Sequence, residues 1–181
     1  MDKTNIWCIL LNYRIKNDYK WFKLYLLLIL LNKMTTGVVR IYYDDEHTKL
    51  DEEYFQVNGK KEGEYKSYHE NGNLCWICTY INDKEEGESK TYYDTGELSF
   101  ICYYVDGNEN GEYKCYYKNG QLEKVLTFID DKKEGECKSY YENGQIECIC
   151  NYVNDIREGE CKVYQSTGEC VIDTYVNGIK Q

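Results

Sequence analysis

The stretch that decides the fold is residues 111–129, which read GEYKCYYKNGQLEKVLTFI. A short tyrosine-rich run lies between two glycines, Gly111 and Gly120, and a longer apolar run follows the second glycine. Aromatic and β-branched residues favour strands, whereas glycine and asparagine favour turns. The stretch therefore predicts two strands joined by a tight turn, which is a β-hairpin.

The same pattern recurs every 24 residues, so the chain is an array of repeats. Two columns of glycine keep this spacing over five units, and the second glycine of each unit follows the first by nine residues. These turn glycines are Gly63, Gly72, Gly87, Gly96, Gly111, Gly120, Gly135, Gly144, Gly159 and Gly168. After residue 37 no connection is long enough for a crossover helix, so the sheet must be antiparallel and meandering.

We predict an all-β fold in which tandem β-hairpin repeats form an elongated, twisted antiparallel meander of twelve strands. Three parts are expected along the chain. Residues 1–36 form a basic and apolar N-terminal segment that is short and either helical or disordered. Residues 37–56 form a degenerate capping repeat, as terminal units of repeat arrays often do, and residues 57–181 hold five tandem units.

The turn inside each hairpin ends on the second glycine, and two units carry a threonine, Thr95 or Thr167, directly before it. A two-residue type I′ turn needs positive φ at both central positions, which β-branched residues resist. A type I turn with the glycine in a left-handed bulge fits all five units better. That register pairs Tyr68 with Leu74, and the equivalent residues of the other units in the same way.

Two tyrosine-rich columns at the end of each short run form the candidate interaction surface, because repeat arrays commonly bind partners along such rows. The first column is Tyr68, Tyr92, Tyr116, Tyr140 and Tyr164. The second, more variable column includes His69, Tyr93, Tyr117 and Tyr141. A glutamate and a lysine column share a face with the first tyrosines, and we expect them to form solvated cross-strand charge pairs. The opposite face carries a variable column: Tyr65, Ser89, Tyr113, Cys137 and Cys161.

Charge separates the two ends of the chain and bears on its partners. Residues 1–36 carry six Lys/Arg and two Asp/Glu, whereas residues 37–181 carry 16 Lys/Arg and 30 Asp/Glu, a net charge of −14. Proteins that bind nucleic acids neutralise phosphates with Lys and Arg, so we expect no nucleic-acid partner. The absence of alanine and proline, with 19 lysines to three arginines, indicates an AT-rich genome.

The N-terminal segment contains the apolar stretch 21–31, WFKLYLLLILL. Its uninterrupted apolar run, residues 24–31, has eight residues, whereas a membrane-spanning helix needs about 20. Its basic flank, with Trp21, Phe22 and Tyr25, suits an interfacial membrane anchor. The simpler interpretation is a dispensable extension, since Met34 stands directly before the first repeat-like residues.

At this point the unit resembles a known family. The pattern Y-x-N-G/D-K-x-E-G-E-x-K-x-Y-Y-x-N-G-Q-L resembles the MORN repeat. It is most similar to the variant in YwqK-type antitoxin repeats and in the MORN-like families of giant DNA viruses. The resemblance covers residues 37–181 and implies a β-hairpin array used for scaffolding, protein binding or membrane association. It implies no catalytic residues.

The ten cysteines include the pairs Cys75-x-x-Cys78 and Cys148-x-Cys150. These pairs lie three units apart, roughly 29 Å by the strand spacing, so they should not meet to form a zinc site. Several cysteines occupy columns that hold tyrosine, leucine or serine in other units, as small apolar residues do in a reducing compartment. We therefore expect no metal ligands, no cofactor and no catalytic residues.

These observations predict a non-enzymatic repeat scaffold that binds a protein partner, of which an inhibitor or antitoxin is one version. The alternative is a membrane-associated scaffold tethered by the apolar stretch 21–31. We expect the protein in the cytoplasm, which for a viral protein is the host cytoplasm, with peripheral membrane association under the alternative.

Overall fold

The structure is a computed structural model that describes residues 35–165 and 167–181. The predicted helical or disordered segment, with the apolar stretch 21–31, lies outside the described residues up to residue 34. Residues Thr36–Gln181 form one structural unit. Within the described residues no helix is long and apolar enough to cross a membrane.

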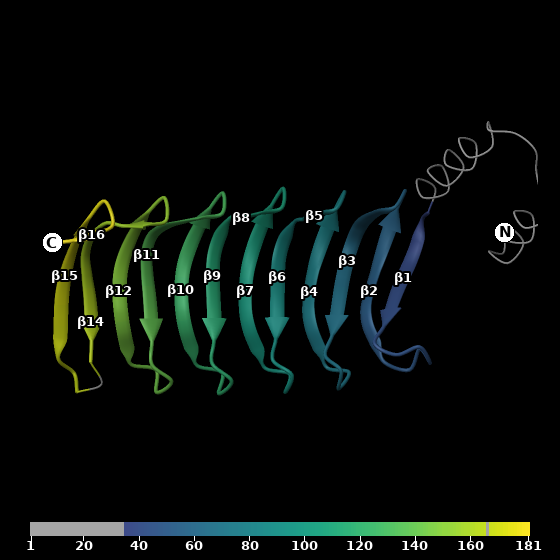
Figure 1. Cartoon of the computed structure of the whole chain (residues 1–181), viewed down its shortest axis with the longest axis horizontal. Coiled ribbons are helices and arrows are strands. Elements are labelled where there is room, and N and C mark those ends of the chain that lie inside the picture. Colours follow the sequence, from purple (N-terminus) through teal and green to yellow (C-terminus); the bar gives the residue numbers. More distant parts are fainter. Residues whose placement is uncertain (1–34, 166) are drawn as a thin grey trace, which may run out of the picture. The chain divides into compact units, whose positions relative to one another are not determined.

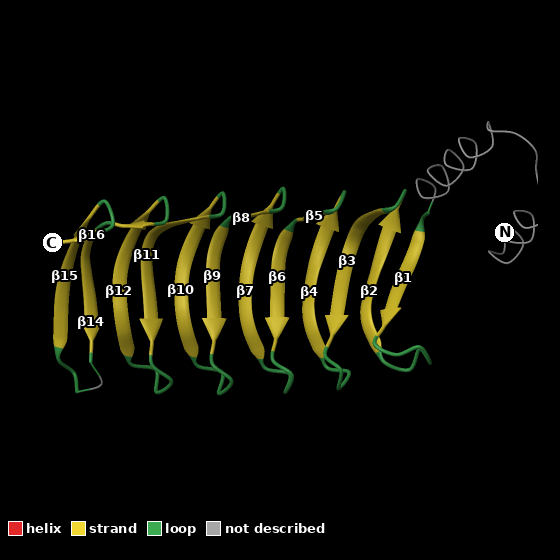
Figure 2. Ribbon diagram, viewed as in Figure 1, coloured by secondary structure: helices red, strands yellow, loops and turns green. Residues whose placement is uncertain are grey.

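Antiparallel strands joined by turns build this unit (Figure 2). The long strands lie side by side in chain order, from β1 at one edge to β15 near the other (Figure 1). Their bounds are β1 (Gly37–Tyr42), β2 (Leu50–Val57), β3 (Lys60–Tyr68), β4 (Leu74–Ile81), β6 (Gly87–Tyr92), β7 (Leu98–Val105), β9 (Gly111–Tyr116), β10 (Leu122–Ile129), β11 (Lys132–Tyr140), β12 (Ile146–Val153), β14 (Gly159–Tyr164) and β15 (Cys170–Val176). The sheet is an open meander, which confirms the predicted fold class.

The sheet has sixteen strands where the sequence predicted twelve. The additional strands are the two-residue segments β5 (Lys84–Glu85), β8 (Asn108–Glu109), β13 (Ile156–Arg157) and β16 (Ile179–Lys180). In the first three cases a single residue, Glu86, Asn110 or Glu158, interrupts what would be one longer strand. The amide of that residue bonds back to the preceding strand, as Glu86 N does to Thr79 O at 2.9 Å. A local bulge therefore divides these strands, and the twelve-strand meander is retained.

The turn inside each hairpin has the predicted geometry. In the first unit Gly72 N donates to His69 O at 2.8 Å, which closes a four-residue turn, and Gly72 has a φ of 87°. Thr95 has no positive φ, as the bulged type I turn requires. Tyr68 lies opposite Leu74, so the predicted register is also confirmed.

The turn between hairpins is of a different kind, which the sequence analysis left unassigned. Val57 pairs with Lys60 across two residues, Asn58 and Gly59, whose φ angles are 52° and 77°. Positive φ at both central positions is the type I′ geometry, which matches the twist of the flanking strands. The equivalent turns have the same signs at Asn82–Asp83, Asp106–Gly107, Asp130–Asp131, Asn154–Asp155 and Asn177–Gly178. The Asn-Gly dipeptide at residues 58–59 was the signal for it.

The variable column proves to lie on the buried face of the sheet. Tyr65, Ser89 and Cys161 are only 4%, 2% and 2% exposed. The columns on the other face hold glutamate and lysine, whose charges are costly to remove from water, so the apolar and small residues take the protected side. Sequence reasoning had recognised the column and its face but not its burial.

Aromatic side chains cover this buried face in place of a second layer. In the first unit the ring of Tyr65 lies 5.9 Å from Tyr54, 4.8 Å from Trp76 and 5.7 Å from Tyr80, measured between centroids. The indole Nε1 of Trp76 donates to Ser89 Oγ of the next unit at 2.8 Å. Such aromatic pairs contribute about 0.5–1.5 kcal/mol each beyond their burial. Each unit is thus stabilised mainly by its neighbours along the sheet.

Replacement of Gly120 by alanine tests the hairpin turn. Its φ is 81°, and a Cβ there would meet no atom within 4 Å, so the cost is that of the backbone alone. We expect the G120A variant to lose about 1–2 kcal/mol in the free energy of unfolding, measured with urea. The control G120N should lose less, because asparagine tolerates the left-handed region. A G120A variant as stable as the parent would contradict the turn geometry.

The buried carboxyl of Glu85 makes the stability of the sheet depend on pH. Burial raises its pKa above the ordinary value of 4.5, although the Tyr80 hydroxyl and Lys61 act against it. Its Oε2 atom is buried without a hydrogen-bond partner. The folded chain therefore holds this proton more tightly than the unfolded chain, so the contribution of Glu85 is most favourable below 4.5 and is lost as the pH rises through the raised pKa.

We accordingly expect E85Q to be more stable than the parent at pH 7, and its thermal midpoint to fall less between pH 5 and pH 7. The exposed Glu97 supplies the control, since the pKa of its carboxyl is lowered, chiefly by a hydrogen bond from Thr95. E97Q should show no such gain at pH 7. An E85Q variant with the pH profile of the parent would exclude the buried carboxyl as its source.

Candidate interaction surface

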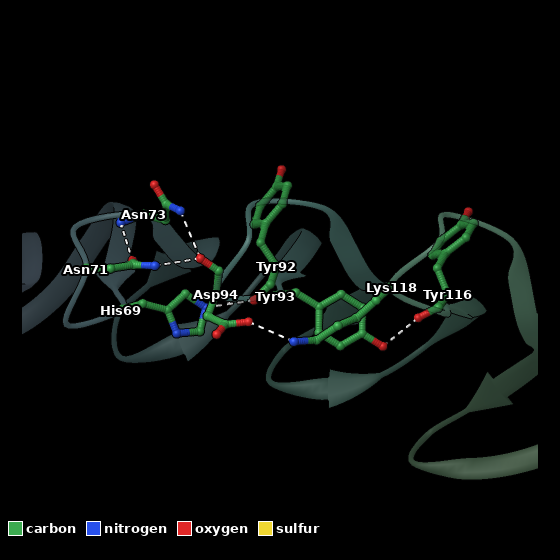
Figure 3. A network of polar contacts seen from close by, with 8 residues as sticks. All are labelled: His69, Asn71, Asn73, Tyr92, Tyr93, Asp94, Tyr116 and Lys118. Atoms are coloured by element: carbon green, nitrogen blue, oxygen red, sulfur yellow. Dashed lines mark hydrogen bonds and ion pairs between the residues drawn. The ribbon is translucent and has the colours of Figure 1, made fainter.

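The first tyrosine column ends the first strand of every hairpin. Each tyrosine lies opposite the residue that opens the second strand, as Tyr92 does opposite Leu98. All five side chains are partly exposed. Figure 3 shows the rings of Tyr92 and Tyr116 directed away from the turn residues Asp94 and Lys118. The structure therefore places this column in a row at the ends of the strands, next to the hairpin turns.

The lysines and glutamates of this face form ion pairs, but the pairs run along a strand and not across two strands as predicted. Each lysine contacts the glutamate two positions before it in its own strand, since residues i and i+2 point to the same face. The pairs are Lys66–Glu64, Lys90–Glu88, Lys114–Glu112, Lys138–Glu136 and Lys162–Glu160. Exposed pairs of this kind contribute at most about 1 kcal/mol, so their main effect is a regular pattern of charge. We call this surface the Glu–Lys–Tyr face.

Shallow grooves cross the Glu–Lys–Tyr face between neighbouring units. One contains side chains from β3, β4 and β6: Glu64, Ile77, Thr79, Glu88, Lys90 and Tyr92. Another contains the residues three repeat periods later: Glu136, Ile149, Asn151, Glu160, Lys162 and Tyr164. The same combination of an acid pair, an isoleucine, a lysine and a tyrosine thus recurs in the array.

The second tyrosine column links each unit to the next. The Tyr93 hydroxyl donates to the carbonyl oxygen of Tyr116 at 2.7 Å (Figure 3), and Tyr117 makes the same bond to Tyr140 at 2.8 Å. Tyr141 repeats it toward Tyr164 at 2.7 Å. In the first unit His69 substitutes for tyrosine, with Nε2 lying 2.9 Å from the Tyr92 carbonyl. The second column therefore holds the backbone beneath the first.

Polar contacts between successive hairpin turns reinforce this row (Figure 3). The side-chain amides of Asn71 and Asn73 donate to the carbonyl oxygen of Asp94 at 2.6 and 2.8 Å. The Asp94 carboxylate in turn pairs with Lys118 of the following unit at 2.9 Å, and this pairing lowers the pKa of Asp94. These contacts between successive hairpin turns thus set the spacing from one unit to the next in the first tyrosine column.

Glutamate side chains link successive inter-hairpin turns at the other end of the strands. The Glu62 carboxylate accepts from the backbone amide of Asn82 in the next turn at 2.9 Å. Three other units repeat this contact, in the pairs Glu86–Asp106, Glu134–Asn154 and Glu158–Asn177. Sequence reasoning missed this role, although the glutamate directly before the first glycine in these units was a visible signal.

The cysteines of the last units depart from the expectation of free thiols. Cys150 and Cys161 form a disulfide between β12 and β14. The Cys148 thiol lies 3.2 Å from Cys150 Sγ and 3.7 Å from Cys161 Sγ. The predicted separation of the pair Cys75-x-x-Cys78 from Cys148 and Cys150 holds, because the three clustered sulfurs all come from the C-terminal units. What the sequence did not reveal is that neighbouring units bring Cys161 beside Cys150.

The antiparallel fold and the hydrogen bonds between successive turns define an open array of β-hairpin repeats. The family model described as MORN repeat variant matches residues 61–82, 85–106, 109–130 and 133–154. Residues 61–154 are therefore four tandem repeats of the MORN repeat variant. MORN repeats are generally involved in protein–protein or membrane interactions. No curated protein matches the chain.

Solved structures with some similarity include a mutant of S. aureus TarM in complex with Fondaparinux, alpha-GlcNAc-glycerol and UDP. It is 14% identical over 68% of this chain and 25% of that chain, with a TM-score of 0.36. The GtfA/B complex bound to UDP and GlcNAc is 11% identical over 62% of this chain and 22% of that one, with a TM-score of 0.26. A Bacteroides fragilis protein of unknown function is 11% identical over 76% and 88%, with a TM-score of 0.16. The chain spans about a quarter of the length of the first two proteins.

Removal of one hydroxyl tests the hydrogen bonds of the second tyrosine column. Y117F keeps the ring but leaves the Tyr140 carbonyl without the donor that lies 2.8 Å away. We expect a loss of about 0.5–1.5 kcal/mol in the free energy of unfolding, measured with urea. The neighbouring substitution Y116F, in the exposed column, is the matched control and should leave stability within about 0.5 kcal/mol of the parent. Equal losses in the two variants would contradict a specific role of the second column.

Proposed function

We propose that the chain is a non-enzymatic repeat scaffold that binds a protein partner through its Glu–Lys–Tyr face. The observation that carries the proposal is the recurrence of one groove composition three repeat periods apart. A partner that lies along the array would meet the same tyrosine and charge pattern at each unit. Tyrosine is enriched in protein interfaces because it buries a large rigid ring and keeps a hydroxyl for hydrogen bonding.

The rigidity of the array supports this function. The hydrogen bonds between successive turns hold the tyrosines at a constant spacing. Little conformational entropy is therefore lost when a long partner binds several of them together. The net charge of −14 on residues 37–181 favours a protein with basic segments over an anionic membrane surface. We expect no catalysis, since the acidic residues of this face recur in every unit and a catalytic pair is normally single.

The finer form of the proposal is an inhibitor- or antitoxin-like protein in the cytoplasm. It rests on the resemblance of the unit to YwqK-type antitoxin repeats and to the MORN-like families of giant DNA viruses. In this form the partner would be an enzyme or toxin that the array covers, and the host cytoplasm would be the site of action of a viral protein.

Affinity purification of the tagged full chain from its native cells, with mass spectrometry, tests the proposal. We expect one dominant protein near equal stoichiometry, and its loss in the triple variant Y92A/Y116A/Y140A, because interface tyrosines that act as hot spots contribute on the order of 2 kcal/mol each. The matched control V105S/I129S/V153S changes exposed residues of the same face at the far end of the second strands, next to the inter-hairpin turns and away from the tyrosine row, and should retain the partner.

A second variant separates binding from folding. In E112K/K114E the ion pair is kept with its charges exchanged, so the sheet should remain intact by circular dichroism while the charge pattern is inverted in this one unit. We expect weaker capture. Retention of the partner by both the tyrosine and the charge variant would refute this face as the binding surface, and recovery of lipid or membrane proteins alone would favour the membrane-associated scaffold.

A further inference from the structure

The buried face opens into a cavity of about 390 Å³ over strands β10 to β15, and four cysteines line it. They are Cys137 on β11, Cys148 and Cys150 on β12, and Cys161 on β14. In the first two units Trp76 and Phe100 occupy the column of Cys148. The small thiol thus leaves space where those units place an aromatic ring, and sulfur atoms form part of the wall of that space.

Three of these sulfurs are close enough to share one ion. The Sγ atoms of Cys148, Cys150 and Cys161 all lie within 4.8 Å of one another. Around a tetrahedral zinc ion, with Zn–S bonds of about 2.3 Å, the sulfurs are about 3.8 Å apart. The separation of 3.7 Å between the sulfurs of Cys148 and Cys161 agrees with this geometry. Cys150 Sγ lies 3.2 Å from Cys148 Sγ and is bonded to Cys161 Sγ, so it would move away from both after reduction. Cys150 and Cys161 are 4% and 2% exposed, so both are shielded from bulk water.

We propose that in the reduced chain Cys148, Cys150 and Cys161 bind one thiophilic divalent metal ion, with Zn²⁺ as the representative ion. Thiolate sulfur selects such ions over Mg²⁺ and Ca²⁺, which prefer oxygen ligands. Three protein ligands leave the fourth tetrahedral position open toward the cavity. The site would then lie on the buried face, away from the Glu–Lys–Tyr face, so it does not depend on the proposed partner binding.

The charge around the cavity suits a bound metal thiolate. Three thiolates with one divalent ion carry a net charge of −1, and the lining of the cavity holds three cations, Lys124, Lys133 and Arg157, against the two carboxylates of Glu123 and Glu147. These cations therefore offset part of the cost of holding negative sulfur in a protected position.

Oxidation state decides whether the site exists. The disulfide between Cys150 and Cys161 leaves Cys148 as the single thiol of the three. A dithiol reductant would transfer two electrons and two protons to this disulfide, giving two thiols and the oxidised reductant. The three thiols would then release three protons as they bind the ion. Metal binding and the disulfide are thus mutually exclusive states of the same cluster.

The pair Cys75-x-x-Cys78 offers an internal contrast. It has the spacing most typical of a zinc motif, yet in the described part of the chain only Cys148, Cys150 and Cys161 form a group of three metal-ligand atoms this close together. The assignment therefore follows from how neighbouring units pack and not from spacing within one strand.

Titration of the full chain with Co²⁺ and then Zn²⁺ tests the proposal, after a dithiol reductant and a chelator have been applied and removed without air. We expect one equivalent of Co²⁺ to give the sulfur-to-cobalt charge-transfer absorption of a tetrahedral thiolate site, and Zn²⁺ to displace it. C148S and C161S should each weaken binding by more than the roughly 10–100-fold that loss of an outer-shell partner costs. C170S, which removes an exposed cysteine, should bind as the parent does.

Each other outcome overturns the proposal. These are the absence of stoichiometric binding by the reduced parent, binding that C148S leaves unchanged, or equal loss in C170S. The oxidised chain, with the 150–161 disulfide verified by peptide mass spectrometry, should bind at least tenfold more weakly, and equal affinity would also overturn it. Circular dichroism of reduced C148S should match that of the reduced parent, so that its loss of binding is not attributed to unfolding.

Discussion

The sheet is a single layer, so within the described residues its apolar face has no helix or second sheet to pack against. This constraint governs the structure of the array. Tyr65 on β3, for example, is shielded by the rings of Tyr54 on β2 and of Trp76 and Tyr80 on β4, and not by a helix or another sheet. Because burial comes only from neighbours along the sheet, a unit is stable only within an array. Accurate repetition of the distance between units is therefore a condition of folding.

The two rows of turns, one at each end of the strands, meet this condition by different means. The hairpin-turn row uses a side-chain donor, the hydroxyl of Tyr93 and its equivalents, which bonds the backbone carbonyl of the next unit. The other uses a side-chain acceptor, the carboxylate of Glu62 and its equivalents, which bonds a backbone amide of the next turn. Each bond contributes only about 1 kcal/mol, but repetition makes the spacing of the exposed face regular. The proposed binding function and the stability of the array thus rely on neighbouring positions of one motif.

The last units show how far the buried face can vary without loss of the fold. Where early units hold Trp76 and Phe100, the last hairpins hold Cys148 with Cys150 and Cys161 beside it. The backbone ladder tolerates this change because the hydrogen bonds of the strands do not depend on the side chains of the buried face. The same scaffold therefore presents an aromatic wall near its start and a thiol-lined cavity near its end.

The fold class, the repeat period, the hairpin turn and the pairing of Tyr68 with Leu74 followed from the sequence by itself. These features are local: they depend on glycine at a left-handed position and on the alternation of residues within one hairpin. Only the tertiary structure decided which face is buried, that the charge pairs run along a strand, that His69 and Tyr93 bond the next unit, and that Cys161 lies beside Cys148 and Cys150. The contacts of His69, Tyr93 and Cys161 depend on the register between units, which joins residues that no spacing within a single unit relates.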